Sequence, residues 1–313
     1  MDRDQMPVLS IIACCMLEDE LVHVLSEDSE LGQLILVENR ECFGLQRKLK
    51  NRNCPPALSP LDRIPEFLNG EKDFLLPAIL KPFCGFKCVE KIHSKLQIQH
   101  DMKVTVVANV LRLGLHKDIE LLRSEVYRNI REMSSFSDGI LIFYGTCGRS
   151  LINTEKDFEA LECPLYFLKD DKGEIVEDCI STVLGGNDVY ARTLANGTGT
   201  FYLTPMWASN WKKMRDETMS FTSDLDGNYL KRYDRVARIN TGLACDTDFD
   251  DNIREFARFY NMNIVELKGR AIISEQSYQN AKNGVVERAS LKIICRSNVS
   301  TFERWDTTDV PNG

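Results

Sequence analysis

The segment Val8-Leu-Ser-Ile-Ile-Ala-Cys14 is short and almost wholly apolar, which is typical of a strand buried on both faces. Leu17, Leu21, Val24 and Leu25 follow at the spacing of one helix face, so we expect a helix directly after the strand. Parallel strands are joined by crossover helices that cover the sheet. This stretch therefore predicts an α/β fold and sets the pattern for the rest of the chain.

The same alternation of short apolar runs and helical patterns continues along the chain. Further strands are expected at residues 34–37, 103–110, 139–144, 165–168, 200–204, 235–239, 264–267 and 291–295. A basic helix is expected to begin near residue 45, and others at 118–133, 178–184, 207–214 and 250–260; Asp178 can cap the helix at 178–184. Strands separated by helices predict a mostly parallel open sheet with flanking helices, in Rossmann-like layers.

One segment departs from this pattern. Six of the ten prolines fall between residues 52 and 100, and dense proline blocks long regular elements. We therefore expect a single α/β domain over residues 1–300, with 46–100 as an insertion or lid, and a polar, flexible tail over 301–313.

Composition narrows the functional classes. The 313 residues carry 39 Lys and Arg against 47 Asp and Glu, a net charge of −8. Phosphate contacts need clustered Lys and Arg, so we expect no nucleic-acid partner. No apolar run approaches the roughly 18 residues of a membrane span, so we expect no membrane association. The start of the chain lacks the positive region of a signal peptide, which predicts a cytoplasmic protein with reduced cysteines.

Familiar catalytic motifs do not occur. The sequence has no Gly-x-Gly-x-x-Gly turn after a strand and no Gly-Lys-Ser/Thr phosphate loop, so standard dinucleotide and P-loop binding are disfavoured. It has neither His-Glu-x-x-His nor a Gly-x-Ser-x-Gly elbow, which disfavours the corresponding metalloproteases and serine hydrolases. A site has to be sought in residues that converge only in space.

Three of the 11 cysteines occupy similar places in the expected topology. Cys14 ends the first strand, Cys147 lies in a turn directly after a strand, and Cys179 lies in the first turn of a helix. Ligands of open α/β sheets bind outside the carboxyl ends of the strands, where thiols far apart in sequence can meet. His116 follows another strand and can join them. Three cysteines and a histidine suit zinc, whereas three cysteines alone suit iron or an iron–sulfur cluster.

The alternative interpretation is that these cysteines are core residues. Cys is among the most buried residue types, and a single Cys at a strand end is more often a small core filler than a ligand. Only the shared placement of the three favours a site. Cys84 and Cys88 form a weaker second candidate pair, because their spacing is loose for metal ligands. Structural roles are expected for Cys15, Cys42, Cys54, Cys163, Cys245 and Cys295.

Several short motifs occur in the order found in one family. They are Ile11-Ile-Ala-Cys14, Leu115-His116, Tyr144-Gly-Thr-Cys147-Gly148, Asp178-Cys179-Ile180 and Gly199-Thr-Phe-Tyr-Leu-Thr204. Over about residues 8–16 and 104–270 the chain resembles domain-of-unknown-function family 1638, an uncharacterised family of methanogenic archaea and bacteria. Each motif is weak alone, and it is their order and spacing that carry the resemblance.

The resemblance implies a functional set and a setting. In that family the equivalents of Cys14, His116, Cys147 and Cys179 look like the functional residues. Its members often occur in genomes rich in corrinoid-dependent methyl transfer, which implies one-carbon metabolism and methanogenesis. This chain departs from the family pattern at Gly148-Arg149-Ser150, at Lys117-Asp118 and in the added segment 46–100.

Three hypotheses follow. The first is a metal-binding protein that holds zinc or iron through these four residues and, if an enzyme, transfers methyl groups to or from a thiol or corrinoid. Glu18, Asp19 and Asp178 would then orient ligands or exchange protons.

The second hypothesis is a non-catalytic accessory or assembly factor, a metal or cofactor carrier that docks on a corrinoid protein or methyltransferase through residues 52–100. The third is a thiol-redox enzyme that uses Cys14 or Cys15, which the lack of a Cys-x-x-Cys motif disfavours. A zinc site would need the sulfur atoms of its cysteines within about 4 Å of one another.

Overall fold

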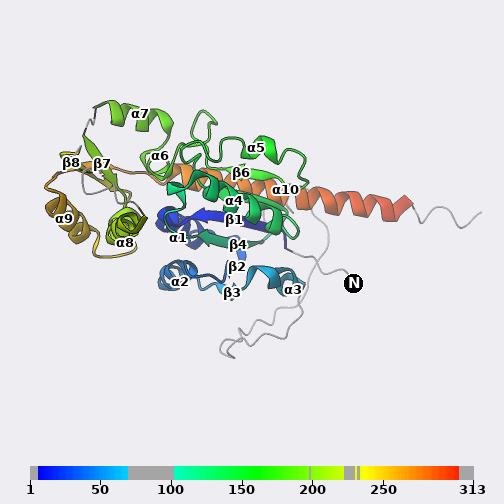
Figure 1. Ribbon diagram of the computed structural model, residues 1–313. Coiled ribbons are helices and arrows are strands. Elements are labelled where there is room, and N and C mark those ends of the chain that lie inside the picture. The colour runs from blue at the N-terminus through cyan, green and yellow to red at the C-terminus, as the bar shows by residue number, and fades with distance from the viewer. Residues whose placement is uncertain (1–5, 70–101, 197–198, 222–229, 231–232, 303–313) are drawn as a thin grey trace, which may run out of the picture.

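The computed structural model describes residues 6–69, 102–196, 199–221, 230 and 233–302. Within these residues the chain forms two parallel sheets, each with helices packed against it (Figure 1). The large sheet has the strand order β3-β2-β4-β1-β5-β6, and the small sheet has the order β7-β8-β9. The predicted α/β fold with a mostly parallel sheet is confirmed.

Apart from β3, which was not predicted, the strands lie close to predicted positions. Their bounds are β1 (Val8–Cys14), β2 (Leu31–Val37), β3 (Ala57–Ser59), β4 (Val104–Leu111), β5 (Gly139–Phe143), β6 (Leu165–Phe167), β7 (Thr200–Leu203), β8 (Arg235–Asn240) and β9 (Asn263–Lys268). The helices are α1 (Glu18–Ser26), α2 (Cys42–Asn51), α3 (Ile64–Leu68), α4 (Ile119–Met133), α5 (Thr154–Asp157), α6 (Cys179–Leu184), α7 (Asn187–Asn196), α8 (Pro205–Phe221), α9 (Phe249–Tyr260) and α10 (Ile272–Phe302).

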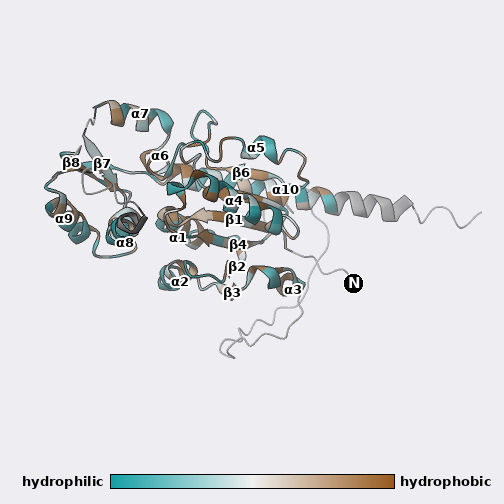
Figure 2. Ribbon diagram, viewed as in Figure 1, coloured by the Kyte–Doolittle hydropathy of each residue, from teal (hydrophilic) through white to brown (hydrophobic). Residues whose placement is uncertain are grey.

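Strand β1 lies between β4 and β5 in the large sheet and is buried along nearly its whole length. Leu9 and Ile11 face a core that α1, α2 and α10 complete, whereas Val8 and Ile12 face a core completed by α3 and α4. Successive side chains point to opposite faces of a strand, so a segment between two helix layers must be apolar throughout. Figure 2 shows these apolar strands between the more polar outer faces of the helices.

The order of the strands creates a crevice at the carboxyl edge of the large sheet. From β1 the chain passes through α1 to β2, and from β4 it passes through α4 across β1 to β5. Helices α1 and α4 lie on opposite faces of the sheet. The connections that leave the neighbouring strands β1 and β4 therefore lie on opposite faces of the sheet. In doubly wound sheets this arrangement opens a binding crevice at the carboxyl edge.

The small sheet has its own core, formed with α8 and α9. Phe201 of β7 stacks on Phe256 of α9 with ring centroids 5.4 Å apart, and Trp211 of α8 meets the same phenylalanine edge-on. From β9 the chain continues into α10, which runs back along the large sheet (Figure 1). Tyr278 and Val285 of α10 are buried against the large sheet's core. In the described part of the chain, no helix is long and apolar enough to cross a bilayer.

Two predictions about elements need correction. The strand predicted at residues 291–295 is wrong, because this apolar run belongs to the long helix α10. A short apolar run fits a strand and a buried helix equally well, so the pattern alone does not separate them. The first part of the predicted insertion is also regular: residues 46–51 complete α2, and β3 forms the edge of the large sheet beside β2. Residues 70–100 of that segment lie outside the described residues, as do 303–313 of the predicted tail.

Candidate functional site

The structure brings the four residues Cys14, His116, Cys147 and Cys179 to the wall of one cavity of about 310 Å³. Each comes from a different segment: the end of β1, the turn after β4, the turn after β5 and the start of α6. The cavity lies outside the carboxyl ends of β1, β4 and β5, and its lining is mostly apolar. We call it the thiol cavity.

Cys14 is held by the centre of the large sheet. It pairs in register with Leu111 of β4 and is the last residue of β1. A 3₁₀ helix, Cys15–Leu17, starts directly after it and leads into α1. The side chain of Cys14 is therefore presented where the central strand gives way to a helix start, which is a favourable position for a thiolate.

Cys147 is positioned by a strained turn. Cys147, Gly148 and Arg149 have positive φ angles of 45°, 67° and 72°, a region that non-glycine residues occupy at a cost. The turn is held because the Cys147 N–H donates to the carbonyl of Glu177 at 2.7 Å. A Cβ atom on Gly145 would lie 2.6 Å from the backbone nitrogen of Asp178, so only glycine permits this close approach. The turn after β5 is thereby fixed beside the start of α6.

Cys179 is positioned by the capped start of α6. Asp178 is the predicted N-cap, and its side chain accepts hydrogen bonds from the N–H groups of Ile180 and Ser181 at 2.9 and 2.8 Å. Across the cavity, the indole Nε1–H of Trp207 in α8 donates to the sulfur of Cys179 at 3.3 Å. The small-sheet part of the chain therefore contributes one wall of the cavity.

His116 stands at the mouth of the thiol cavity. Gly114, with a φ of 79°, turns the chain after β4 into the short 3₁₀ helix Leu115–Lys117 that carries the histidine. The side chain has an exposed surface, but its ring faces Trp207 with centroids 5.8 Å apart. Partial loss of hydration lowers the pKa of His116, and the neighbouring Lys117 lowers it further. The neutral imidazole is the form that binds metals.

The thiols of the cavity differ in acidity. Hydrogen bonding with the adjacent Cys15 thiol is the largest influence on Cys14; it outweighs burial and lowers the pKa of Cys14, with smaller help from Met16 and Tyr144. Burial raises the pKa of Cys147 and of Cys179, and nearby negative charge adds to the effect. In the absence of a cation, Cys14 is therefore the most acidic of the three cavity thiols.

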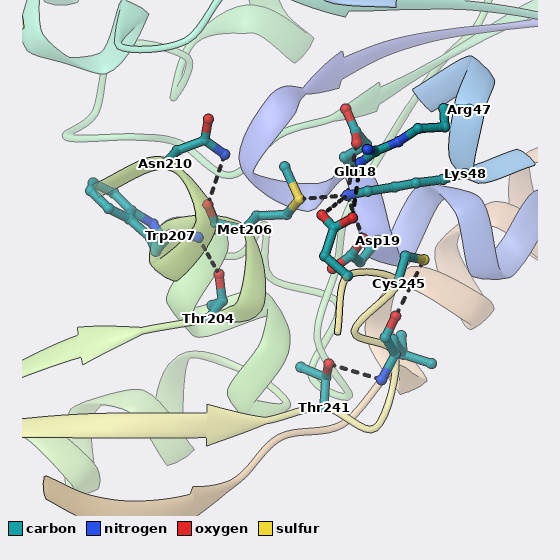
Figure 3. Close-up of polar contacts among 12 residues, drawn as sticks. Glu18, Asp19, Arg47, Lys48, Thr204, Met206, Trp207, Asn210, Thr241 and Cys245 are labelled. Atoms are coloured by element: carbon teal, nitrogen blue, oxygen red, sulfur yellow. Dashed lines mark hydrogen bonds and ion pairs between the residues drawn. The ribbon is translucent and has the colours of Figure 1, made fainter. Parts of the chain in front are cut away.

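The acidic residues that were expected to assist the site do not all do so. Glu18 and Asp19 turn away to the ammonium group of Lys48, which lies 2.8 Å from an oxygen of each (Figure 3). Asp178 lines the thiol cavity but is engaged in capping α6. The prediction that Glu18 and Asp19 orient ligands is wrong, because a buried lysine from another helix satisfies them.

Of the remaining cysteines, several are buried, as expected of core residues. Cys42 and Cys163 are buried in the two cores of the large sheet. Cys15 is buried as well but also lines the thiol cavity. Cys84 and Cys88, the weaker candidate pair, lie outside the described residues.

Several residues that line the cavity were not among the predicted site residues. Tyr144 is fully within the wall, beside Cys14, and burial is the largest cause that raises its pKa. Trp207 closes the wall from α8, and Arg112 lies at the end of β4. Arg112 could have been predicted, because it directly follows a strand. No local sequence pattern predicts Trp207, since it reaches the cavity from a helix that packs on the other sheet.

The four donor groups are of the types that a soft metal ion prefers, because thiols and imidazoles are common ligands of zinc. Their present spacing is wider than a coordination sphere. Among the residues described, no three His, Cys, Asp or Glu side chains are grouped closely enough to hold a metal ion. Binding of a metal would therefore require the thiols to turn toward one another.

Fold and site together define a two-sheet α/β protein with a thiol-lined cavity at the carboxyl edge of its large sheet. The chain belongs to domain-of-unknown-function family 1638: the sequence profile of this family, described as "protein of unknown function", matches residues 110–278, more than half of the chain. The match contains His116, Cys147 and Cys179, while Cys14 lies before it. No curated protein and no solved structure matches this chain.

Proposed function

We propose that the thiol cavity binds one zinc or iron ion through Cys14, Cys147, Cys179 and His116. The observation that supports this most directly is convergence: four segments far apart in sequence place three thiols and one imidazole around a single cavity. The neutral imidazole and the lowered pKa of Cys14 favour the forms in which these groups act as ligands. A cation would also lower the pKa of the two remaining thiols, whose present neutrality comes from burial.

The reaction that fits such a site is methyl transfer to or from a thiol. A bound metal would supply Lewis acidity that keeps a coordinated thiol deprotonated. The residues of the chain would exclude water, since the lining is mostly apolar, and Trp207 would hold Cys179 through its N–H group. A corrinoid protein or a methyltransferase is the partner class we propose. An accessory role as a metal carrier is the alternative within the same proposal.

Metal analysis tests the site. We expect about one zinc or iron per chain in protein purified without oxygen, and loss of that metal in Cys14→Ser, Cys147→Ser and Cys179→Ser. Cys163→Ser is the matched control, because Cys163 is a buried cysteine that does not line the cavity. Metal-free wild-type protein, together with three variants that fold normally, would refute the proposal.

X-ray absorption on the loaded protein then separates the two roles. A catalytic centre keeps one position open for substrate, so we expect three protein ligands and one exchangeable ligand. Four protein ligands would instead mark a closed site and favour the carrier role.

A second candidate function rests on Cys14 alone. This residue lines the cavity next to the buried thiol of Cys15, and its pKa is the one that is lowered. Such a thiolate acts as a nucleophile without any metal. We expect iodoacetamide at neutral pH to alkylate Cys14 before Cys147 and Cys179, as mapped by peptide mass spectrometry. Equal alkylation of the three would rule this function out, and protection of all three by zinc would favour the metal site.

A further inference from the structure

A second cavity, of about 600 Å³, adjoins the thiol cavity, and Cys15 belongs to the walls of both. We call it the polar cavity, because charged and polar side chains dominate its lining. Its walls come from the start of α1, from α2, from α8 and from the loop that precedes α9. It therefore lies where the large-sheet and small-sheet parts of the chain meet. No feature of the proposed metal site uses it.

The floor of the polar cavity is a buried ion cluster. Lys48 is only 3% exposed, and its ammonium group contacts Glu18 and Asp19 at 2.8 Å and the sulfur of Met206 at 3.0 Å (Figure 3). Burial acts to lower the pKa of Lys48, but the two carboxylates outweigh it and raise the pKa. The three donors of the ammonium group are thus engaged. The floor is therefore an internally paired ion cluster rather than a free binding group.

The Glu18 side chain in this floor packs closely against Gly44. A Cβ atom at Gly44 would lie 3.1 Å from one oxygen of Glu18, so the glycine of α2 leaves room for the carboxylate. Arg47, also on α2, pairs with Asp246 of the facing loop at 2.9 Å. Most of the charged groups of the cavity are therefore already matched with one another.

Two charges at the polar cavity remain unmatched. Arg40 lies just before α2 and Asp248 just before α9, and both are exposed. Within the part of the chain that the structure describes, neither side chain has an ion pair or a hydrogen bond. The two come from different segments and carry opposite charges. Ser209 and Asn210 of α8 add neutral polar groups to the same lining.

We propose that the polar cavity binds a small zwitterion, with its carboxylate at Arg40 and its ammonium group at Asp248. A simple anion would satisfy Arg40 and leave the Asp248 carboxylate unmatched. A simple cation would leave the arginine unmatched. A molecule that carries both charges complements both segments at once. The cavity volume lies within the range of small-molecule sites.

A series of ω-amino acids from glycine to 6-aminohexanoic acid tests this, because it varies the separation of the two charges. We expect at least one member to bind the full-length protein with a Kd below about 1 mM, measured by calorimetry or ligand-detected NMR. The matching alkanoic acid and alkylamine, which each lack one charge, are expected to bind at least about tenfold more weakly.

Variants locate the binding. Arg40→Gln and Asp248→Asn each change an exposed side chain, and each is expected to weaken the zwitterion at least about tenfold. Arg128→Gln is the matched control, since this exposed arginine pairs only within α4. The thermal midpoint of each variant shows that the fold is intact.

Three results would overturn the proposal. One is that no member of the series binds. Another is that Arg40→Gln and Asp248→Asn leave the binding unchanged. The third is that the alkanoic acids bind as tightly as the amino acids, which would define a plain anion site. Because none of these measurements depends on a metal, their failure is distinct from failure of the proposed metal centre.

Discussion

At the scale of single residues, the start of α1 concentrates buried carboxyl groups. Glu18, Asp19 and Glu20 are consecutive, and all are at most 5% exposed. The first two share Lys48, but one oxygen of the Glu20 carboxyl has no hydrogen-bond partner among the described residues. Burial raises the pKa of Glu20 from 4.5 to about 8, and the neighbouring Asp19 adds to the effect. Glu20 therefore retains its proton in the folded protein at neutral pH.

This residue makes stability depend on pH. The folded state holds the Glu20 proton more tightly than the unfolded chain, so the free energy of unfolding should fall as pH rises from 4.5 toward 8. We expect Glu20→Gln to remove a part of this fall on the order of 2 kcal/mol, measured by urea unfolding at several pH values. The exposed Glu159→Gln is the control. If Glu20→Gln and the wild type show the same dependence of unfolding free energy on pH, the Glu20 carboxyl ionises as easily in the folded protein as in the unfolded chain.

At the scale of elements, the thiol cavity depends on how turns meet helix starts. The turn after β5 and the residues before α6 touch backbone to backbone at Gly145. Helix α6 has only six residues, so its start is maintained by the Asp178 cap and by packing rather than by intrinsic helix stability. The cap therefore sets the position of Cys179.

Removal of the cap should be costly. Asp178→Ala leaves the N–H groups of Ile180 and Ser181 without their acceptor, and we expect a loss of about 1 kcal/mol in the free energy of unfolding. Asp178→Asn retains an acceptor oxygen and should recover most of the loss. Chemical denaturation of the three proteins measures this difference. Equal stability of the Ala and Asn variants would mean that the cap contributes nothing.

At the scale of the whole molecule, α10 ties the end of the described chain to its beginning. Lys282 of α10 and Asp28, which follows α1, are 4% and 3% exposed and lie 2.7 Å apart. The hydroxyl group of Tyr278 donates to the other oxygen of Asp28 at 2.6 Å. Helix α10 thereby covers the large sheet after the chain has passed through the small sheet.

Breaking this buried pair should destabilise the entire protein. Lys282→Met leaves the Asp28 carboxylate buried without a cation, with only the Tyr278 hydroxyl and the Glu30 N–H as hydrogen-bond donors, so we expect a loss of about 3–5 kcal/mol in the free energy of unfolding. The double variant Asp28→Asn/Lys282→Met removes both charges and should regain a large part of that loss. If the double variant is as unstable as the single one, the cost arises from packing and not from the unpaired charge.

Much of the fold was predictable because it is local. Strand β1 was predicted at its observed bounds, and the Asp178 cap was recognised from its residue type. The strand predicted at residues 291–295 failed because a segment of five residues, four of them apolar, is too short to show a helical or a strand periodicity. The three cysteines and the histidine were found because each ends a strand, lies in the turn after a strand or begins a helix. Trp207 was not found, since its indole reaches Cys179 from the other sheet.

The amino-acid sequence is enough to predict the alternation of strands and helices, and with it the placement of Cys14, Cys147 and His116 at or after strand ends and of Cys179 at a helix start. Apolar periodicity and capping act over a few residues, so they can be recognised in the chain. The pairing of Glu18 and Asp19 with Lys48, in place of a role beside the thiols, follows from tertiary packing. The same packing also forms the polar cavity beside them, because segments as distant as Lys48 and Met206 meet only when the two sheets pack together.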